Sequence, residues 1–130
     1  VGPRGECTVN LAHSLARRGH SVNITACVSV RQAFLAAQVG ARYVSFFAGK
    51  AMDAGADAES SLAAIMRHLR GSSCELILGS VRDQGRLERY LLVGPDVVTL
   101  PFRMLYAVPE HPSSELAVEG FQASYDKLDS

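Results

Sequence analysis

The sequence predicts an α/β fold in which four short parallel strands alternate with helices. Four glycines each stand a few residues before an apolar segment, as in loops that lead from a helix into a strand: Gly19, Gly40, Gly71 and Gly94. The stretches between these apolar segments carry hydrophobic residues at helical spacing. Single strands that alternate with helices are typical of a parallel sheet with right-handed crossovers.

Each predicted element follows from this pattern. The strands are expected at 22–26, 43–47, 75–79 and 96–100. Helices are expected at 6–18, after Ser29, after a long loop at 48–57, at 83–93 and at 114–128, with a connecting segment at 101–108. The first helix has no strand before it in this sequence.

Two arrangements fit such a series, a (β/α)8 barrel and an open doubly wound sheet. No glycine-rich phosphate fingerprint follows any strand, and each strand end carries a polar residue. Both observations favour a barrel, whose active-site mouth draws on many strands. Four strands cannot close a barrel, so the expected fold is the C-terminal half of a (β/α)8 TIM barrel, with open edges unless a partner covers them.

Length and composition predict one globular domain over residues 1–130. Hydrophobic residues make up 48% of the sequence, which is enough for one core. A length of 130 residues is too short for two ordinary domains. The chain starts Val-Gly-Pro-Arg-Gly without an initiator Met. We therefore expect it to begin inside a longer protein.

Charge and cysteine content argue against several classes of function. The 13 basic and 13 acidic residues give a net charge of zero, so no nucleic-acid partner is expected. No signal peptide or long apolar run is present, so no membrane partner is expected either. The cysteines Cys7, Cys27 and Cys74 are an odd number without metal-ligand spacing. We expect a cytoplasmic protein that holds neither a metal nor another cofactor.

Polar residues interrupt the first strand. Asn23 and Thr25 alternate with Val22, Ile24 and Ala26, so the two polar side chains should leave the strand on one face. In a barrel they would point inward near the mouth, where they could hydrogen-bond a hydroxylated substrate or a catalytic water. The alternative is that they satisfy each other or a buried water.

The second strand repeats this feature. Alternation places Ser45 and Phe47 on the same face, and Lys50 stands just beyond the strand. Lys50 could contact a phosphate as a point charge, or act as a Schiff-base nucleophile if desolvation lowered its pKa. The alternative is a solvated lysine on a loop.

A third group follows the third strand. Ser80 and Arg82 lie in the sequence Ser80-Val81-Arg82-Asp83, which we expect to open a helix. A helix N-terminus with a free hydroxyl and a guanidinium is suited to a phosphate. Ser80 or Asp83 could instead be a plain N-cap, with Arg82 in water. Lys50, Ser80 and Arg82 from consecutive strands could share one phosphate dianion.

The last predicted helix has more apolar surface than half a barrel needs. We expect a homo-oligomer that forms through this helix. Its apolar residues are Leu116, Val118, Phe121, Tyr125 and Leu128.

Three motifs together resemble one known family. The stretch VNITACVSVRQAFLAAQVGARYVSFFAGK, followed by LILGSVR and DVVTLP, carries the patterns NxT, SxFxG and GSxR in order. In these patterns the chain resembles the transaldolases and fructose-6-phosphate aldolases, which are class I (β/α)8 enzymes. The resemblance covers essentially the whole chain, from the approach to barrel strand five to the C-terminus.

The resemblance implies roles for the seven candidate residues. Asn23 and Thr25 would lie near the reactive amine and the water that shuttles protons, and would be catalytic. Ser45 and Phe47 would bind the substrate, while Lys50, Ser80 and Arg82 would hold its phosphate.

The chain also departs from the family pattern. The family's Schiff-base lysine lies on barrel strand four, whereas this sequence contains only Lys50 and Lys127. The chain as given should therefore be inactive. Lys50 stands where the family usually has arginine. Lysine keeps the positive charge but cannot bind a phosphate with two parallel hydrogen bonds as arginine does. Phe47 stands where simple aldolases tend to have tyrosine, and so favours transaldolase.

The resemblance implies an enzyme of sugar-phosphate metabolism. The parent protein would transfer a dihydroxyacetone unit from a ketose phosphate to an aldose phosphate through a lysine Schiff base, with this chain as the phosphate-binding half. One alternative is aldol cleavage of the fructose-6-phosphate aldolase type. Another is a non-catalytic half barrel that binds a sugar phosphate or associates with itself.

Overall fold

The computed structural model describes residues 8–128. It divides into two compact units, Val1–Leu100 and Pro101–Ser130, and each is described by itself. The expectation of a single domain over residues 1–130 stays a prediction. Glu6, at which the first helix was expected to begin, lies outside the described residues. The same holds for Cys7, one of the three cysteines.

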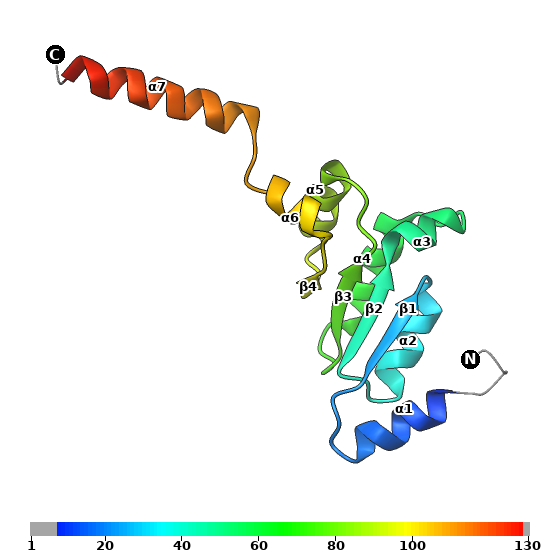
Figure 1. Ribbon diagram of the computed structural model, residues 1–130. Helices are drawn as coiled ribbons and strands as arrows, with labels where there is room; N and C mark the ends of the chain where they lie inside the picture. Colours follow the sequence, from blue (N-terminus) through cyan, green and yellow to red (C-terminus); the bar gives the residue numbers. More distant parts are fainter. Residues whose placement is uncertain (1–7, 129–130) are drawn as a thin grey trace. The chain divides into compact units, whose positions relative to one another are not determined.

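The first unit is a parallel α/β sheet (Figure 1). Its strands run in the order β1-β2-β3-β4, and every neighbouring pair is parallel. The predicted α/β class with four parallel strands is therefore confirmed, and it is consistent with half of a TIM barrel. The elements are α1 (Thr8–Arg17), β1 (Asn23–Cys27), α2 (Val30–Gln38), β2 (Tyr43–Phe47), α3 (Ala48–Asp53), α4 (Ala58–Leu69), β3 (Glu75–Gly79), α5 (Gln84–Val93) and β4 (Val97–Val98).

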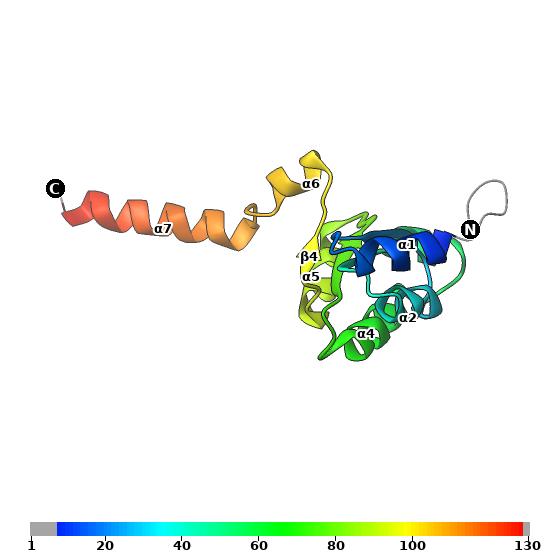
Figure 2. The same cartoon turned by 90° about the horizontal axis from the view of Figure 1, so that it is seen from below.

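The core lies between the sheet and helices on one of its faces. α2 packs beside α4, and α4 beside α5; Figures 1 and 2 show α2 and α4 against the same side of the sheet. Four strand residues that face these helices are fully buried: Val44, Phe46, Leu76 and Leu78. Leu62 and Ile65 of α4 are buried against them in the same core. The alternate residues of β2 and β3 consequently lie on the opposite side, which we call the open face.

The register of β2 against β3 is regular over the whole length of both strands. Tyr43 pairs with Glu75, and the pairing continues without a shift to Phe47 and Gly79. Both strands therefore end at the same level, and the segments that follow them leave the sheet side by side. This alignment positions the candidate site.

The first strand differs from the predicted alternation. A β-bulge falls between Ile24 and Cys27, where the register to β2 shifts, and Ala26 has a φ of 58°. Ala26 is consequently exposed and Cys27 takes the buried position, so the prediction that Ala26 shares the apolar face with Ile24 is wrong. The extra residue of a bulge changes which side chains point inward.

Two other boundaries also differ from the sequence prediction. The loop expected at 48–57 contains a short helix, α3, which begins directly after β2. The fourth strand comprises only Val97 and Val98 instead of 96–100. The Asp96 carboxylate accepts a hydrogen bond from the backbone N–H of Leu76 at 2.7 Å, so its side chain is bonded to the neighbouring strand just before β4 begins.

The second unit consists of α6 (Phe102–Ala107) and α7 (Pro112–Leu128). None of the described residues of either helix is buried. The apolar residues of α7 are largely exposed, including Phe121 at 74% and Leu128 at 88%. Between residues 8 and 128, no helix has the length and apolar character needed to cross a membrane.

We expect the core to be sensitive to small losses of volume. Ile65→Val removes a methylene from a fully buried side chain and should lower the free energy of unfolding by about 1 kcal/mol. Leu92→Ala removes more atoms, but from a side chain that is 89% exposed. It should change the free energy of unfolding by no more than about 0.5 kcal/mol. Urea denaturation followed by circular dichroism compares the two, and equal midpoints would contradict this placement of the core.

Candidate functional site

The open face carries the first group of candidate residues. The Ser45 hydroxyl donates a hydrogen bond to Oδ1 of Asn23 at 3.0 Å across the β1–β2 pair. Ser45 is 5% exposed, whereas Asn23 and Thr25 are exposed. Asn23 thus bonds to Ser45, which is a different partner from the Thr25 that the sequence alone suggested. The amide of Asn23 and the side chain of Thr25 are accessible to solvent.

Phe47 ends β2 and lies across Gly79 of the neighbouring strand. A Cβ at Gly79 would come within 3.3 Å of the Phe47 ring. The absence of a side chain at Gly79 therefore lets the ring lie close against the β3 backbone. Phe47 remains partly exposed at the carboxyl edge of the sheet, beside the segments that carry the remaining candidates.

A groove runs between α1, β1 and α2 and includes two candidate residues. Its volume is about 460 Å³, and Asn23 and Thr25 contribute to its wall. The rest of its lining is largely apolar, from Val9, Leu11, Ala12, Leu15, Ile24, Leu35 and Ala36 among others. The polar part of this mostly apolar groove is formed by the two polar side chains of β1 together with Thr8 and Gln32.

The second group of candidates meets where β2 and β3 end. Lys50 lies on α3, and its neighbour Gly49 donates its backbone N–H to the carbonyl of Ser80 at 3.0 Å. A Cβ at Gly49 would come within 2.6 Å of Arg82 Nε and 2.7 Å of Ser80 Oγ. The start of α3 therefore lies directly against the Ser80–Arg82 segment, and the structure brings Lys50, Ser80 and Arg82 to one edge of the sheet.

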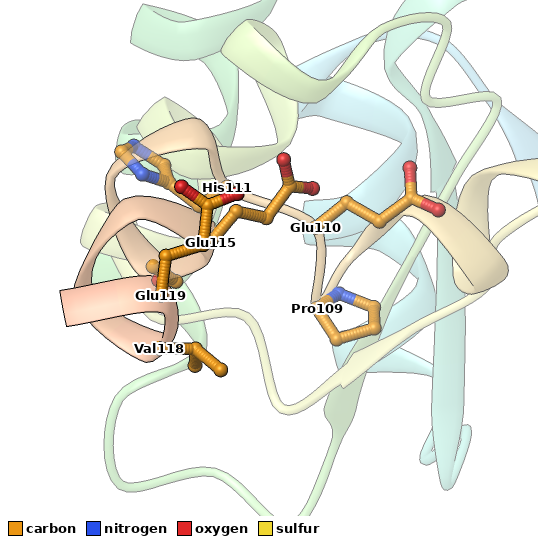
Figure 3. Close-up of a pocket in the computed structure, with 7 residues that line it drawn as sticks. Pro109, Glu110, His111, Glu115, Val118 and Glu119 are labelled. Atoms are coloured by element: carbon orange, nitrogen blue, oxygen red, sulfur yellow. The ribbon is translucent and has the colours of Figure 1, made fainter. Parts of the chain in front are cut away.

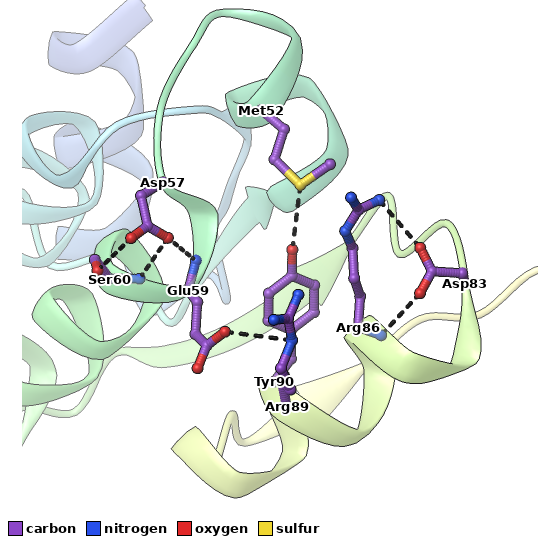
Figure 4. Close-up of polar contacts among 8 residues, drawn as sticks. All are labelled: Met52, Asp57, Glu59, Ser60, Asp83, Arg86, Arg89 and Tyr90. Atoms are coloured by element: carbon purple, nitrogen blue, oxygen red, sulfur yellow. Dashed lines mark hydrogen bonds and ion pairs between the residues drawn. The ribbon is translucent and has the colours of Figure 1, made fainter.

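The Ser80–Arg82 segment is a loop, which corrects the expectation that it opens a helix. α5 begins only at Gln84, and Asp83 is its N-cap. The Asp83 carboxylate accepts the backbone N–H of Arg86 at 2.9 Å and a guanidinium N–H of the same residue at 3.0 Å (Figure 4). Since Asp83 caps this helix, Ser80 and Arg82 precede it and carry their side chains on a loop.

Asp53 is a site residue that sequence reasoning missed. Its carboxylate forms an ion pair with the guanidinium of Arg82, and both side chains are exposed. The hydrogen bond from Arg82 is the main cause that lowers the pKa of Asp53. Desolvation opposes it, and the positive charges of Arg82 and Lys50 lower the pKa further. Asp53 stands three residues after Lys50, a spacing that places two side chains on the same face of a helix. Because a loop was expected at 48–57, this spacing did not indicate a helix face.

Contacts between α3, α4 and α5 support this edge. The Tyr90 hydroxyl of α5 lies 3.6 Å from the Met52 sulfur of α3 (Figure 4). An ion pair of 3.5 Å links Arg89 to Glu59 of α4. These contacts connect the helix that carries Lys50 and Asp53 to α5, and α5 to α4.

Backbone strain also marks the carboxyl edge. Ala26 and Ser80 are the two non-glycine residues with positive φ among residues 8–128, at 58° and 59°. Ala26 lies within the last part of β1, and Ser80 follows β3 directly. Such residues cost conformational energy and cluster at functional sites. Ala26 follows the candidate Thr25, and Ser80 is itself a candidate residue.

Other features of the described residues do not form a comparable site. A pocket of about 540 Å³ at the start of α7 is lined by Pro109, Glu110, His111, Ser114, Glu115, Val118 and Glu119 (Figure 3). It contains none of the candidates. No group of three or more His, Cys, Asp or Glu residues within 8–128 is arranged to hold a metal ion. Cys27 and Cys74 are buried, and burial raises the pKa of Cys74 to about 11, so neither thiol is an activated nucleophile.

Comparison with known sequences gives a match to one family over nearly the whole chain. The sequence profile of the family described as Transaldolase/Fructose-6-phosphate aldolase matches residues 5–130. All seven candidates fall within that match.

Curated relatives give the same result. A protein named probable transaldolase from Sinorhizobium medicae is 37% identical over 117 residues, and one from Brucella ovis is 35% identical over 116. One from Rhizobium meliloti is 35% identical over 120 residues. Each alignment covers 88% of this chain and 54% of the relative. The chain therefore spans about half the length of these curated relatives.

The contact between Gly49 and the Ser80–Arg82 loop yields a test of the site's geometry. Gly49→Ala places a Cβ 2.5 Å from the Ser80 carbonyl oxygen, a backbone atom that cannot easily move. We expect a loss of about 1–3 kcal/mol in the free energy of unfolding. Gly120→Ala is the matched control, because nothing lies within 4 Å of its Cβ and alanine favours a helix. If Gly49→Ala unfolds at the same urea concentration as the wild type, the close contact between Gly49 and the Ser80 carbonyl is absent.

The Asp53–Arg82 pair yields a second test. A lowered pKa means that the pair stabilises the fold above the unfolded-state pKa of Asp53, and that this contribution is lost as the pH falls through the folded-state value. In a carboxyl-carbon NMR titration, Asp53 should titrate below an ordinary aspartate, and Arg82→Gln should raise its pKa. Asp57, whose pKa is lowered first by Ser60, should not respond. An unchanged Asp53 titration in Arg82→Gln would contradict the ion pair.

Proposed function

Because the chain belongs to the transaldolase/fructose-6-phosphate aldolase family, we propose that it forms the phosphate-binding half of a transaldolase-like enzyme of sugar-phosphate metabolism. The parent enzyme transfers a dihydroxyacetone unit from a ketose phosphate to an aldose phosphate. In this proposal the amine that forms the Schiff base lies outside residues 1–130, whose lysines are Lys50 and Lys127. The cytoplasm is the proposed compartment.

The observation that supports this proposal most is the convergence at the carboxyl edge. Two cations and one hydroxyl, from Lys50, Arg82 and Ser80, lie on adjacent segments held together through Gly49. A phosphate dianion needs this combination of charge and hydrogen-bond donors, and arginine supplies a planar fork for its oxygens. Lys50 contributes a point charge at the same edge. This group binds the phosphate of the sugar in our proposal.

The open face completes the proposed pocket. Asn23 and Thr25 act near the Schiff base and the proton-carrying water, and Ser45 holds the Asn23 amide through its 3.0 Å hydrogen bond. Phe47 lies between this face and the proposed phosphate-binding residues, and forms an apolar wall for the carbon chain of the sugar. The substrate would thus lie along the sheet from β1 to the ends of β2 and β3.

The exposed apolar side chains of α7 support a further part of the proposal, a homo-oligomer formed through that helix. Sugar phosphates are the proposed small-molecule partners, with no role for nucleic acid or membrane. Isolated apolar residues on a surface are common, whereas α7 exposes several large ones, which a second copy of the helix would cover.

The function can be tested on the full-length parent protein. With fructose 6-phosphate as donor and erythrose 4-phosphate as acceptor, we expect transfer of the three-carbon unit and a covalent adduct trapped by borohydride. Arg82→Ala should raise KM for fructose 6-phosphate at least about tenfold, because a phosphate contact by a charged donor contributes roughly 1.5–3 kcal/mol. Arg17→Ala, which removes the same charge at the end of α1, should not.

The outcomes separate the proposal from its alternatives. Absence of both transfer and trapped adduct would exclude a Schiff-base transaldolase. Free dihydroxyacetone released without an acceptor would indicate simple aldol cleavage instead. Unchanged KM in Arg82→Ala would remove Arg82 from the phosphate site.

A further inference from the structure

The proposed phosphate site already contains an anion of the protein itself. Asp53 forms an ion pair with Arg82, the residue with the largest number of donors in the site. The charge of Lys50 also lowers the pKa of Asp53, although less than the hydrogen bond and the charge of Arg82 do. One carboxylate therefore interacts with both of the cations that the proposal assigns to the phosphate.

The fold gives Asp53 no other evident task. It is the last residue of α3, where a negative charge meets the unfavourable end of the helix dipole. Its side chain is 47% exposed, so it fills no space in the core. The ion pair with Arg82 is the interaction that explains an aspartate at this position.

We propose that Asp53 is an internal competitor for the phosphate site, which occupies the Arg82 guanidinium until a phosphate displaces it. This inference rests on the proposed function, since it assumes that Arg82 binds phosphate. A phosphate oxygen and the Asp53 carboxylate require the same N–H donors, and two anions beside one guanidinium repel each other. The affinity of the site is consequently lower than its two cations alone would give.

Such a competitor has a direct consequence for binding. While the site is empty, the guanidinium is paired with the Asp53 carboxylate at the surface. When a phosphate binds, Asp53 loses its partner and gains an anionic neighbour, so its pKa rises on binding. When the phosphate leaves, the carboxylate takes its place, which favours release.

The test measures binding of inorganic phosphate to the 130-residue chain by calorimetry at neutral pH and low salt. Asp53→Asn keeps the size of the side chain and removes its charge, and we expect phosphate to bind about three- to tenfold more tightly, since about 1.4 kcal/mol is tenfold. Asp53→Glu keeps the charge and should bind like the wild type. Glu119→Gln removes the same charge from α7 and controls for net charge.

A second measurement is independent of affinity. Carboxyl-carbon NMR of the wild type should show the Asp53 pKa rising when phosphate is added, while that of Asp57 stays constant. Asp57 is suitable because its carboxylate bonds to Glu59 and Ser60 on α4 and is not paired with Arg82.

The results distinguish this inference from the proposed function. If Arg82→Ala abolishes phosphate binding but Asp53→Asn binds equally or more weakly than the wild type, Asp53 is not a competitor and only this inference fails. If Arg82→Ala binds as tightly as the wild type, or the wild type does not bind phosphate, the proposed phosphate site fails and this inference fails with it. Tighter binding by Asp53→Asn together with loss in Arg82→Ala supports both.

Discussion

The unbroken parallel pairing of β2 with β3 is the interaction on which the rest of the structure depends. It fixes Phe47 opposite Gly79, so that the two strands end level and the chain leaves both at the same edge. Helix α3 and the Ser80–Arg82 loop then meet at Gly49, where the absence of a side chain leaves room for the Ser80 carbonyl and for the side chains of Ser80 and Arg82. The buried residues on the helix-covered face keep this register, because a shift by one residue would exchange the two faces of each strand.

The sequence predicted most of this fold, for reasons that can be traced to particular residues. Tyr43–Phe47 and Glu75–Gly79 are bounded by glycines and loops and have the observed limits. The bulge in β1 could not be predicted, because Ala26 adopts a left-handed conformation that alanine rarely prefers. α3 was missed because six residues are too few for a periodic pattern, and its stability comes from contacts such as Met52 with Tyr90.

The candidate site was predictable as a set of residues but not as an arrangement. Strand alternation and motif spacing identified the polar positions, and the structure places them on the open face and at the carboxyl edge. The Ser45–Asn23 hydrogen bond, the N-cap at Asp83 and the ion pair of Asp53 depend on distances between segments that are far apart in the sequence. Local pattern carries no information on such distances, and the role of Asp53 therefore required the structure.

The left-handed backbone of Ser80 sets two demands on one position. Glycine would adopt this conformation at no steric cost and would make the loop more stable, but it would remove the hydroxyl that we propose binds the phosphate. Serine keeps the hydroxyl at the expense of strain. A search for thermostable variants that selects on folding alone would therefore favour glycine at this position, and would obtain a stronger scaffold with a poorer site.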